Sequence, residues 1–137
     1  MSRQLLVMSP KRVQLLSADE LIRAAEERFG SILRVQTVAE GPADCELYIT
    51  PADDYPFSLA HFAHNRTIAL EGTPEQNAEL AAWVRSLLPA DFPRVIAADQ
   101  GWLGHVDLTP GITAEEVLSR WVDHSTPAWD ANDPDLR

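Results

Sequence analysis

Histidine and carboxylate side chains are the groups in this sequence best suited to acid–base chemistry. His105 and Asp107 lie two residues apart in an apolar run, so on a strand they share one face. A carboxylate beside a histidine fixes the tautomer and raises the basicity of the ring, as general base catalysis requires. One hypothesis is therefore a small hydrolase or isomerase that uses His61, His105 and Asp107. The same pattern also fits a solvated strand face without chemistry.

Metal and cofactor chemistry has little support in the sequence. His61 and His64 resemble an H-x-x-H ligand pair, but positions three apart on a strand point to opposite faces. Cys45 is the only cysteine and no second ligand pair has a suitable spacing, so we expect no metal and no cofactor. A thiolate pair with a histidine is conceivable, but the apolar run around Cys45 favours a buried, inert thiol. Walker, dinucleotide-binding, G-x-S-x-G and H-E-x-x-H motifs are absent.

Two loops, PADDYP at 51–56 and DQGW at 99–102, place carboxylates next to an aromatic residue between strands. Tyr and Trp are enriched as interface anchors, and a flanking acid suits an arginine or lysine on a partner. The residues expected to bind a partner are Asp53, Asp54, Tyr55, Asp99, Trp102 and His105. The alternative is that Trp102 folds back over the core and the aspartates cap turns.

Composition and charge describe one acidic globular domain. The 137 residues are 45% hydrophobic and 23% charged, which is sufficient for a single core. Phosphate backbones and anionic membranes repel a net charge of −10, so we expect a protein partner with a basic surface rather than nucleic acid or a membrane. No stretch approaches 18 apolar residues, residues 1–16 lack a signal peptide's apolar core, and one cysteine cannot form an internal disulfide. A cytoplasmic location is the expectation.

Three helices are predicted from one capping pattern, Ser/Thr-x-x-Glu/Gln, in which the hydroxyl accepts from an early backbone N–H group. The predicted N-caps are Ser17, Thr73 and Thr113. Pro89 ends the second helix, because the residue before a proline is biased away from helical geometry. The predicted apolar face of the third helix consists of Val117, Leu118, Trp121 and Val122.

Apolar runs predict strands at 4–8, 32–38, 45–49, 94–98 and 105–108, and a hairpin at 57–70 that turns at His64-Asn65. Residues 32–38 alternate as a half-buried strand does. Consecutive strands between helices favour an α+β fold: a single domain over residues 1–124 with a mostly antiparallel sheet of about five to six strands and three helices mainly on one face. A parallel neighbour across the second helix stays open. Residues 125–137 have the composition of a polar, flexible tail that Trp129 could anchor.

Residues 66–122 contain a helix ending in WVRSLLP (83–89), a strand, and the run DQGWLGHVDLTPGITAEEV (99–117). In this general pattern the chain resembles small acidic immunity proteins of actinobacterial-type polymorphic toxin systems. The resemblance implies a non-catalytic inhibitor that neutralises a basic partner or toxin by stoichiometric binding, and it assigns no residue roles. A third hypothesis is a homodimeric scaffold without activity of its own.

Overall fold

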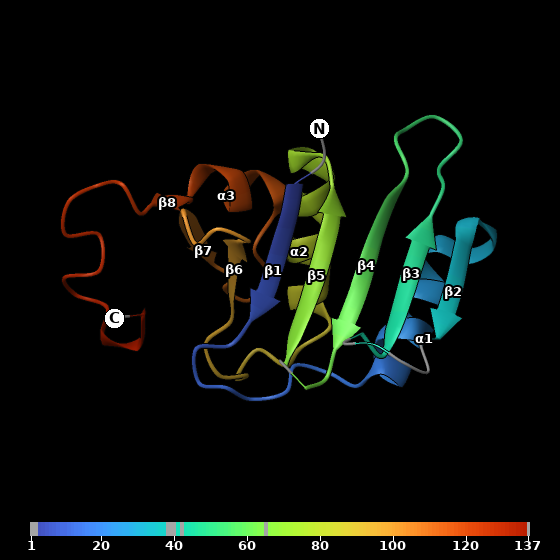
Figure 1. Cartoon of the computed structure of the whole chain (residues 1–137), viewed down its shortest axis with the longest axis horizontal. Coiled ribbons are helices and arrows are strands. Elements are labelled where there is room, and N and C mark those ends of the chain that lie inside the picture. Colours follow the sequence, from blue (N-terminus) through green and yellow to red (C-terminus); the bar gives the residue numbers. More distant parts are fainter. Residues whose placement is uncertain (1–2, 38–40, 42, 65, 137) are drawn as a thin grey trace.

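Eight strands form one sheet, in the order β2-β3-β4-β5-β1-β6-β7-β8, and every neighbouring pair is antiparallel (Figure 1). The computed structural model describes residues 3–37, 41, 43–64 and 66–136. The strands are β1 Arg3–Met8, β2 Leu33–Thr37, β3 Cys45–Ile49, β4 Phe57–Phe62, β5 Thr67–Gly72, β6 Ile96–Asp99, β7 Gly104–Asp107 and β8 Val122–Asp123.

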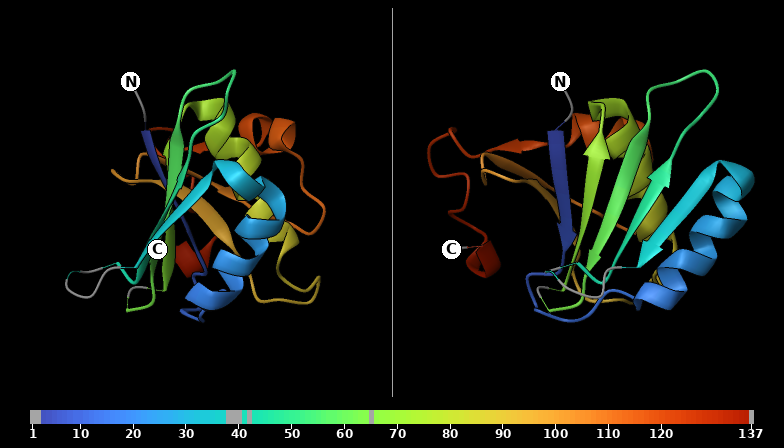
Figure 2. Two further views of the ribbon diagram at one scale, coloured as in Figure 1. Left: turned by 90° about the vertical axis from the view of Figure 1, so that its right-hand side faces the viewer. Right: turned by 45° about the vertical axis from the view of Figure 1, so that its right-hand side comes forward.

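The helices cover one face of this sheet and leave the other face open, as the left panel of Figure 2 shows. They are α1 Ala18–Phe29, α2 Pro74–Ser86 and α3 Ala114–Ser119, with short 3₁₀ helices η1 Gly30–Ile32 and η2 Pro134–Leu136. The α+β class with three helices and an antiparallel sheet is therefore confirmed. The predicted count of five to six strands is wrong, because the sheet has eight.

All three helix starts follow their capping boxes. In each box the N-cap hydroxyl accepts from a backbone N–H, and the side chain three residues later accepts from the N–H of the cap. The pairs are Ser17 with Glu20, Thr73 with Gln76, and Thr113 with Glu116. Because each box lies within four residues of sequence, the helix starts could be predicted without knowledge of the tertiary structure.

The third helix ends earlier than its apolar pattern indicates. Val117 is buried at 2% exposure, but Leu118 is 49% exposed. Val122 leaves the helix and pairs with His105 as part of β8. The predicted helical face is therefore wrong for Leu118, which is exposed, and for Trp121 and Val122, which lie beyond the end of α3 because β8 pairs with β7.

β1 lies in the middle of the sheet, between β5 and β6. Because both neighbours are antiparallel to β1, β5 and β6 run in the same direction on either side of it, and α2 connects them. The sequence left open a parallel pair between the two strands that α2 connects. These strands, β5 and β6, do not pair with each other, because β1 lies between them. The β3–β4 and β6–β7 loops consequently emerge at the same end of the sheet.

The core lies between the helices and the sheet. Its fully buried members from the strands include Val7, Leu47, Ile49, Ile68, Leu70 and Val106. Arg85 of α2 is also buried, at 3% exposure, and its guanidinium donates to three carbonyl oxygens: Leu108 at 2.9 Å, and Leu88 and Pro89 at 3.2 Å. This side chain joins the end of α2 to the segment that leaves β7.

β2 is an edge strand, and its burial differs from the half-buried prediction. Leu33 is partly buried, whereas Arg34, Val35, Gln36 and Thr37 are all exposed. The reason is position, since among the described strands only β3 lies beside β2. Val38 of the predicted strand and Asn65 of the predicted turn lie outside the described residues.

The C-terminal segment, residues 125–136, returns toward the start of β6. Arg94 donates from both terminal nitrogens to the carboxylate of Asp133, at 2.6 and 2.7 Å. Lys11 pairs with Asp135 at 2.9 Å. These ion pairs, together with ring contacts of Trp129, hold the segment beside the outer strands (Figure 1).

Candidate functional site

A cavity of about 710 Å³ opens where the β6–β7 loop, α3 and the start of α2 meet. We call it the hollow. Its apolar lining includes Leu5, Leu103, Leu118 and the indoles of Trp102 and Trp121, and its carboxylates are Asp99 and Asp123. Three of the lining side chains are exposed large hydrophobics: Trp102 at 40%, Leu103 at 69% and Leu118 at 49%. The hollow therefore combines apolar surface with negative charge.

The loop that forms one wall is held by Asp99. Its Oδ1 accepts from the N–H groups of Leu103 at 2.6 Å and Gly104 at 3.3 Å, while its carbonyl accepts from the N–H of Trp102 at 3.0 Å. Trp102 adopts φ of 56°, which is uncommon for a residue with a side chain. Asp99 thus caps its own turn, as one sequence-based alternative predicts, and the turn leaves the indole partly exposed.

Gly104 allows the opposite wall to approach closely. A Cβ atom at this position would overlap the indole of Trp121, with Cζ2 at 2.7 Å and two further ring atoms closer. The indole of Trp121 therefore lies directly against the backbone of β7. This contact fixes one indole of the hollow to the sheet.

Four rings form a cluster beside the hollow: Trp102, His105, His124 and Trp129. His124 Nδ1 lies 2.8 Å from the carbonyl oxygen of Trp102, so this nitrogen carries the proton. His124 Nε2 then accepts from Nδ1 of His105 at 2.7 Å. His105 is 3% exposed, and burial, followed by the neighbouring His124, lowers its pKa below the ordinary value of 6.5.

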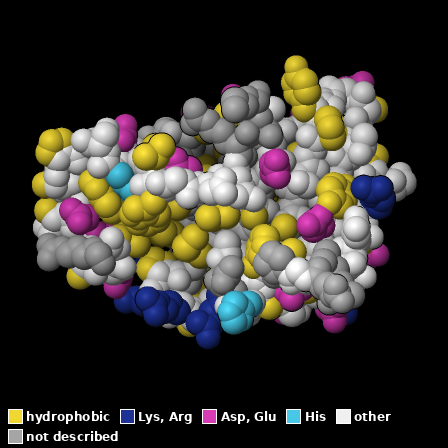
Figure 3. All heavy atoms as spheres, viewed as in Figure 1, with side chains coloured by type: hydrophobic (Ala, Val, Ile, Leu, Met, Phe, Trp, Pro, Cys, Tyr) yellow, Lys and Arg dark blue, Asp and Glu magenta, His cyan; other side chains and the backbone are white. Residues whose placement is uncertain are grey.

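The ring of His124 also stacks on Trp129, with centroids 3.6 Å apart. In Figure 3, hydrophobic side chains gather on the open face over β1, β6 and β7, next to the C-terminal segment. His105, a predicted partner-binding residue, is 3% exposed and contacts the rings of Trp102, His124 and Trp129, whereas Trp102 is 40% exposed.

Asp107 forms an ion pair with Arg94 instead of the expected hydrogen bond with His105. Its carboxylate accepts from the guanidinium of Arg94 at 2.8 Å, and Arg94 also holds Asp133. The two carboxylates raise the pKa of Arg94, so this cation is permanent. The expected His–Asp pair is replaced by a His–His pair and a separate ion-pair network.

His61 lies elsewhere, on the helix-facing side of β4. It is 2% exposed, with Nε2 2.8 Å from the carbonyl oxygen of Leu16 and Nδ1 2.8 Å from Oδ2 of Asp44. Nε2 also lies 3.4 Å from the side-chain nitrogen of Gln14, so both ring nitrogens have polar neighbours. The hydrogen bond from His61 lowers the pKa of Asp44. The ring therefore joins the segment before α1 to the sheet.

The three residues of the catalytic hypothesis are far apart. Four strand spacings, or roughly 19 Å, separate β4 from β7. His61 also faces the helices, whereas His105 is on the open face. None of His61, His105 and Asp107 lines the hollow.

No described group of three or more His, Cys, Asp or Glu side chains could hold a metal ion. His64 is exposed, whereas His61 is held by Asp44 and Leu16. Cys45 is 1% exposed, and burial, with a smaller contribution from Asp44, raises the pKa of its thiol. This environment agrees with the interpretation of Cys45 as an inert core residue.

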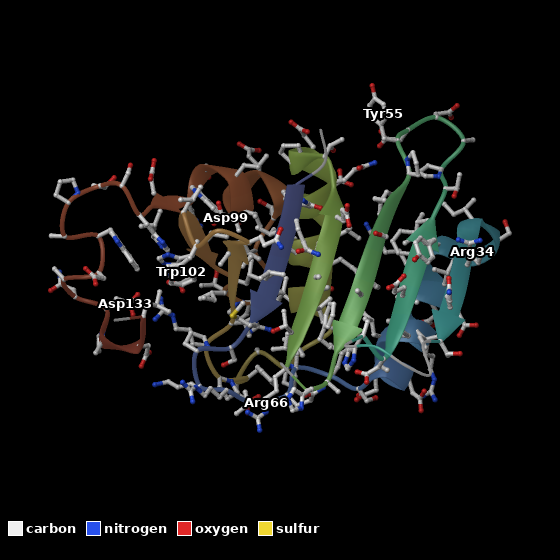
Figure 4. The ribbon with its side chains drawn as sticks, viewed as in Figure 1. Arg34, Tyr55, Arg66, Asp99, Trp102 and Asp133 are labelled. Carbon is white, nitrogen blue, oxygen red and sulfur yellow. The ribbon has the colours of Figure 1, made fainter. Side chains whose placement is uncertain are left out.

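The second predicted loop is not part of the hollow. Asp53, Asp54 and Tyr55 are exposed, Tyr55 at 72%, and Asp54 accepts from the N–H of Tyr55 at 2.8 Å. Figure 4 shows Tyr55 and Asp99 at the same end of the sheet, with β4, β5 and β1 between their loops. The two loops share an end of the molecule but form separate surfaces.

Comparison with protein-family models, curated proteins and solved structures found no match. Within the residues that the structure describes, no helix is both long and apolar enough to cross a membrane. What can be said of function therefore depends on the geometry of this chain.

Sequence reasoning did not select several residues of the hollow. Leu103, Leu118, Trp121 and Asp123 line it, and His124 and Trp129 support Trp102. Leu118 and Trp121 were expected in a buried helical face, and Trp129 was expected only as an anchor of the C-terminal segment. The only cue in the sequence was the density of aromatic and acidic residues between positions 99 and 130.

Proposed function

We propose that this chain is a non-catalytic, cytoplasmic protein-binding domain that neutralises a basic partner, as the immunity proteins that it resembles do. The observation that carries the proposal is the hollow. Exposed apolar side chains rarely converge without a binding role, and here Trp102, Leu103 and Leu118 converge beside two carboxylates. The net charge of −10 adds long-range attraction for a basic protein.

The chemistry of the hollow suits an arginine or lysine side chain of the partner. The aliphatic stem of such a residue packs on apolar surface, and its charged head pairs with carboxylates or stacks on an indole. Asp123 accepts from the N–H of Ser125 at 2.8 Å, and this hydrogen bond lowers the pKa of the carboxyl. The acid is therefore ionised at neutral pH. Asp99 and Asp123 together supply the negative charge.

No specific observation favours the catalytic alternative. A hydrolase or isomerase based on His61, His105 and Asp107 needs the three side chains around one substrate. His61 and His105 are buried on opposite faces of the sheet, and Asp107 is bound to Arg94.

The test begins with the partner. The protein is immobilised, a protein from an extract of the source cells is retained and identified, and its affinity is measured in purified form by calorimetry. Leu103→Lys and Leu118→Lys place a cation in the hollow and should each weaken binding by about 30-fold or more, because a central contact contributes about 2 kcal/mol. Tyr55→Ala tests whether the 51–56 loop also touches the partner.

Val35→Lys is the matched control, because Val35 is 37% exposed on β2, away from the hollow. Its affinity should stay within about twofold of that of the unaltered protein. Binding should weaken as salt rises, since screening shortens the range of the attraction. Full affinity of both hollow variants would show that the hollow is not the binding site. If the immobilised protein retains no partner, the proposed binding function is wrong.

A further inference from the structure

The two edges of the sheet are protected to different degrees. At one edge, β8 has only two residues, and the described chain continues past it into ring contacts with Trp129. At the other edge, β2 has five residues, and no described strand lies beyond it. The left panel of Figure 2 looks onto this edge, with β2 in front and α1 beside it.

The outward backbone groups of β2 follow from its pairing with β3. The N–H of Thr50 donates to the carbonyl oxygen of Ile32 at 3.2 Å, so Ile32 and Thr50 are a hydrogen-bonded pair. Antiparallel pairs alternate, which makes Arg34 and Gln36 the residues that bond to β3. Leu33, Val35 and Thr37 therefore direct their N–H and C=O groups away from the sheet.

β2 lacks several of the usual defences of an edge strand. Natural edges carry charged residues (most often lysine), proline, a bulge or an inward-pointing charge. LRVQT contains neither lysine nor proline, and its five residues pair in unbroken register with β3. Its one charged side chain, Arg34, lies over the ring of Tyr48, with the guanidinium carbon 4.8 Å from the centroid. Ile32 and Val35 remain 39% and 37% exposed.

We propose that a second copy of this chain pairs antiparallel with β2, centred on Val35. This register places Val35 against the same residue of the second copy, Leu33 against Thr37, and Arg34 against Gln36. No like charges face one another, and each outward N–H finds a carbonyl oxygen. The strand is thus complementary to itself, as a twofold interface requires.

The resulting dimer would join two eight-stranded sheets into one. Two five-residue strands make a small interface, so the dimer should depend on protein concentration. Two chains of net charge −10 repel each other, and added salt should therefore strengthen the dimer. This salt dependence is opposite to that expected for a basic partner at the hollow.

Sedimentation equilibrium from about 1 µM to about 1 mM tests the pairing. The mass should rise from 15.2 kDa toward twice that value. Val35→Pro removes an outward N–H without touching the bonds to β3, and should leave a monomer with an unchanged circular dichroism spectrum. Val35→Lys should do the same through charge, in case proline perturbs the strand.

Leu103→Lys is the matched control and should dimerise normally. A 15.2 kDa species at every concentration would overturn the inference, as would a dimer that survives both Val35 substitutions. Loss of the dimer in Leu103→Lys alone would place self-association at the hollow instead. The two proposals fail separately, because Val35→Lys reports on self-association and Leu103→Lys on partner binding.

Discussion

His105 and His124 share a hydrogen bond of 2.7 Å between Nδ1 of the first ring and Nε2 of the second. His124 Nδ1 also lies 2.8 Å from the carbonyl oxygen of Trp102, so the pair links β7, β8 and the loop of the hollow. His105 is 3% exposed, and its burial in this cluster makes its protonation a determinant of stability.

The first prediction concerns pH. The pKa of His105 is lowered by burial and by His124, so the unfolded chain binds more protons just below pH 6.5. The free energy of unfolding should fall as pH is lowered from 6.5 toward the folded pKa. Among nearby charges, Asp107 and Asp133 oppose the lowering and Arg94 adds to it.

Urea denaturation at a series of pH values measures this dependence. His105→Gln should reduce the slope, and His64→Gln, which alters an exposed ring, should keep it. The carboxylates whose pKa values are lowered, such as Asp44 and Asp133, lose their contribution at lower pH, as they approach their own range. An identical slope in His105→Gln would contradict the assignment.

The second prediction concerns Gly104. Gly104→Ala should destabilise the fold by about 1 to 3 kcal/mol, because the new methyl group overlaps the indole of Trp121. Gly101→Ala is the control in the same loop, where the nearest atom to the added carbon is Leu103 Cγ at 3.5 Å. Thermal unfolding compares the two variants. Equal melting temperatures of Gly104→Ala and Gly101→Ala would show that the methyl group at position 104 does not clash with Trp121.

The third prediction concerns the C-terminal segment. Arg94→Met removes the paired hydrogen bonds to Asp133 and should cost about 1 to 3 kcal/mol. Amide exchange over residues 125–136 should accelerate in this variant. Lys11→Met breaks a more exposed pair with Asp135, so its effect should stay below about 1 kcal/mol. Unchanged exchange in Arg94→Met would show that the contacts of Trp129 and Lys11 suffice to anchor the segment.

The fourth prediction concerns the buried guanidinium of Arg85. Arg85→Met leaves the carbonyls of Leu88, Pro89 and Leu108 without this donor and should destabilise the protein by about 3 kcal/mol or more. Arg120→Met is the control, because Arg120 pairs with Glu116 at the surface and contributes about 0.5 kcal/mol or less. Chemical denaturation distinguishes the two. Similar midpoints would argue against the bridge between α2 and β7.

Local signals predicted the helices well, and distant contacts explain what was missed. The capping boxes at Ser17, Thr73 and Thr113 are complete within four residues each, so no other part of the chain decides them. The eighth strand depends instead on Val122 meeting His105, seventeen positions earlier in the sequence. Turn chemistry could be anticipated for Asp99, but the packing of Trp121 against Gly104 could not.

The candidate site shows the same division. Asp99 and Trp102 were predicted from a four-residue break, and both line the hollow. Asp107, on the same strand, was the expected hydrogen-bond partner of His105. Its carboxylate accepts a hydrogen bond from Arg94 instead. His105 meets His124 because β8 pairs with β7, a register that periodicity does not reveal.

The central place of β1 has a consequence for synthesis. Leu5 pairs with Asp99, so the first strand made must wait for 94 further residues before both of its neighbours exist. At ribosomal speeds this interval is roughly 5 to 20 s. The nascent chain can assemble β2 to β5 as a local meander meanwhile, while the β6–β8 portion is still being translated. Completion of the sheet is therefore a late event, and deletion of the first strand would leave two half-sheets without the element that joins them.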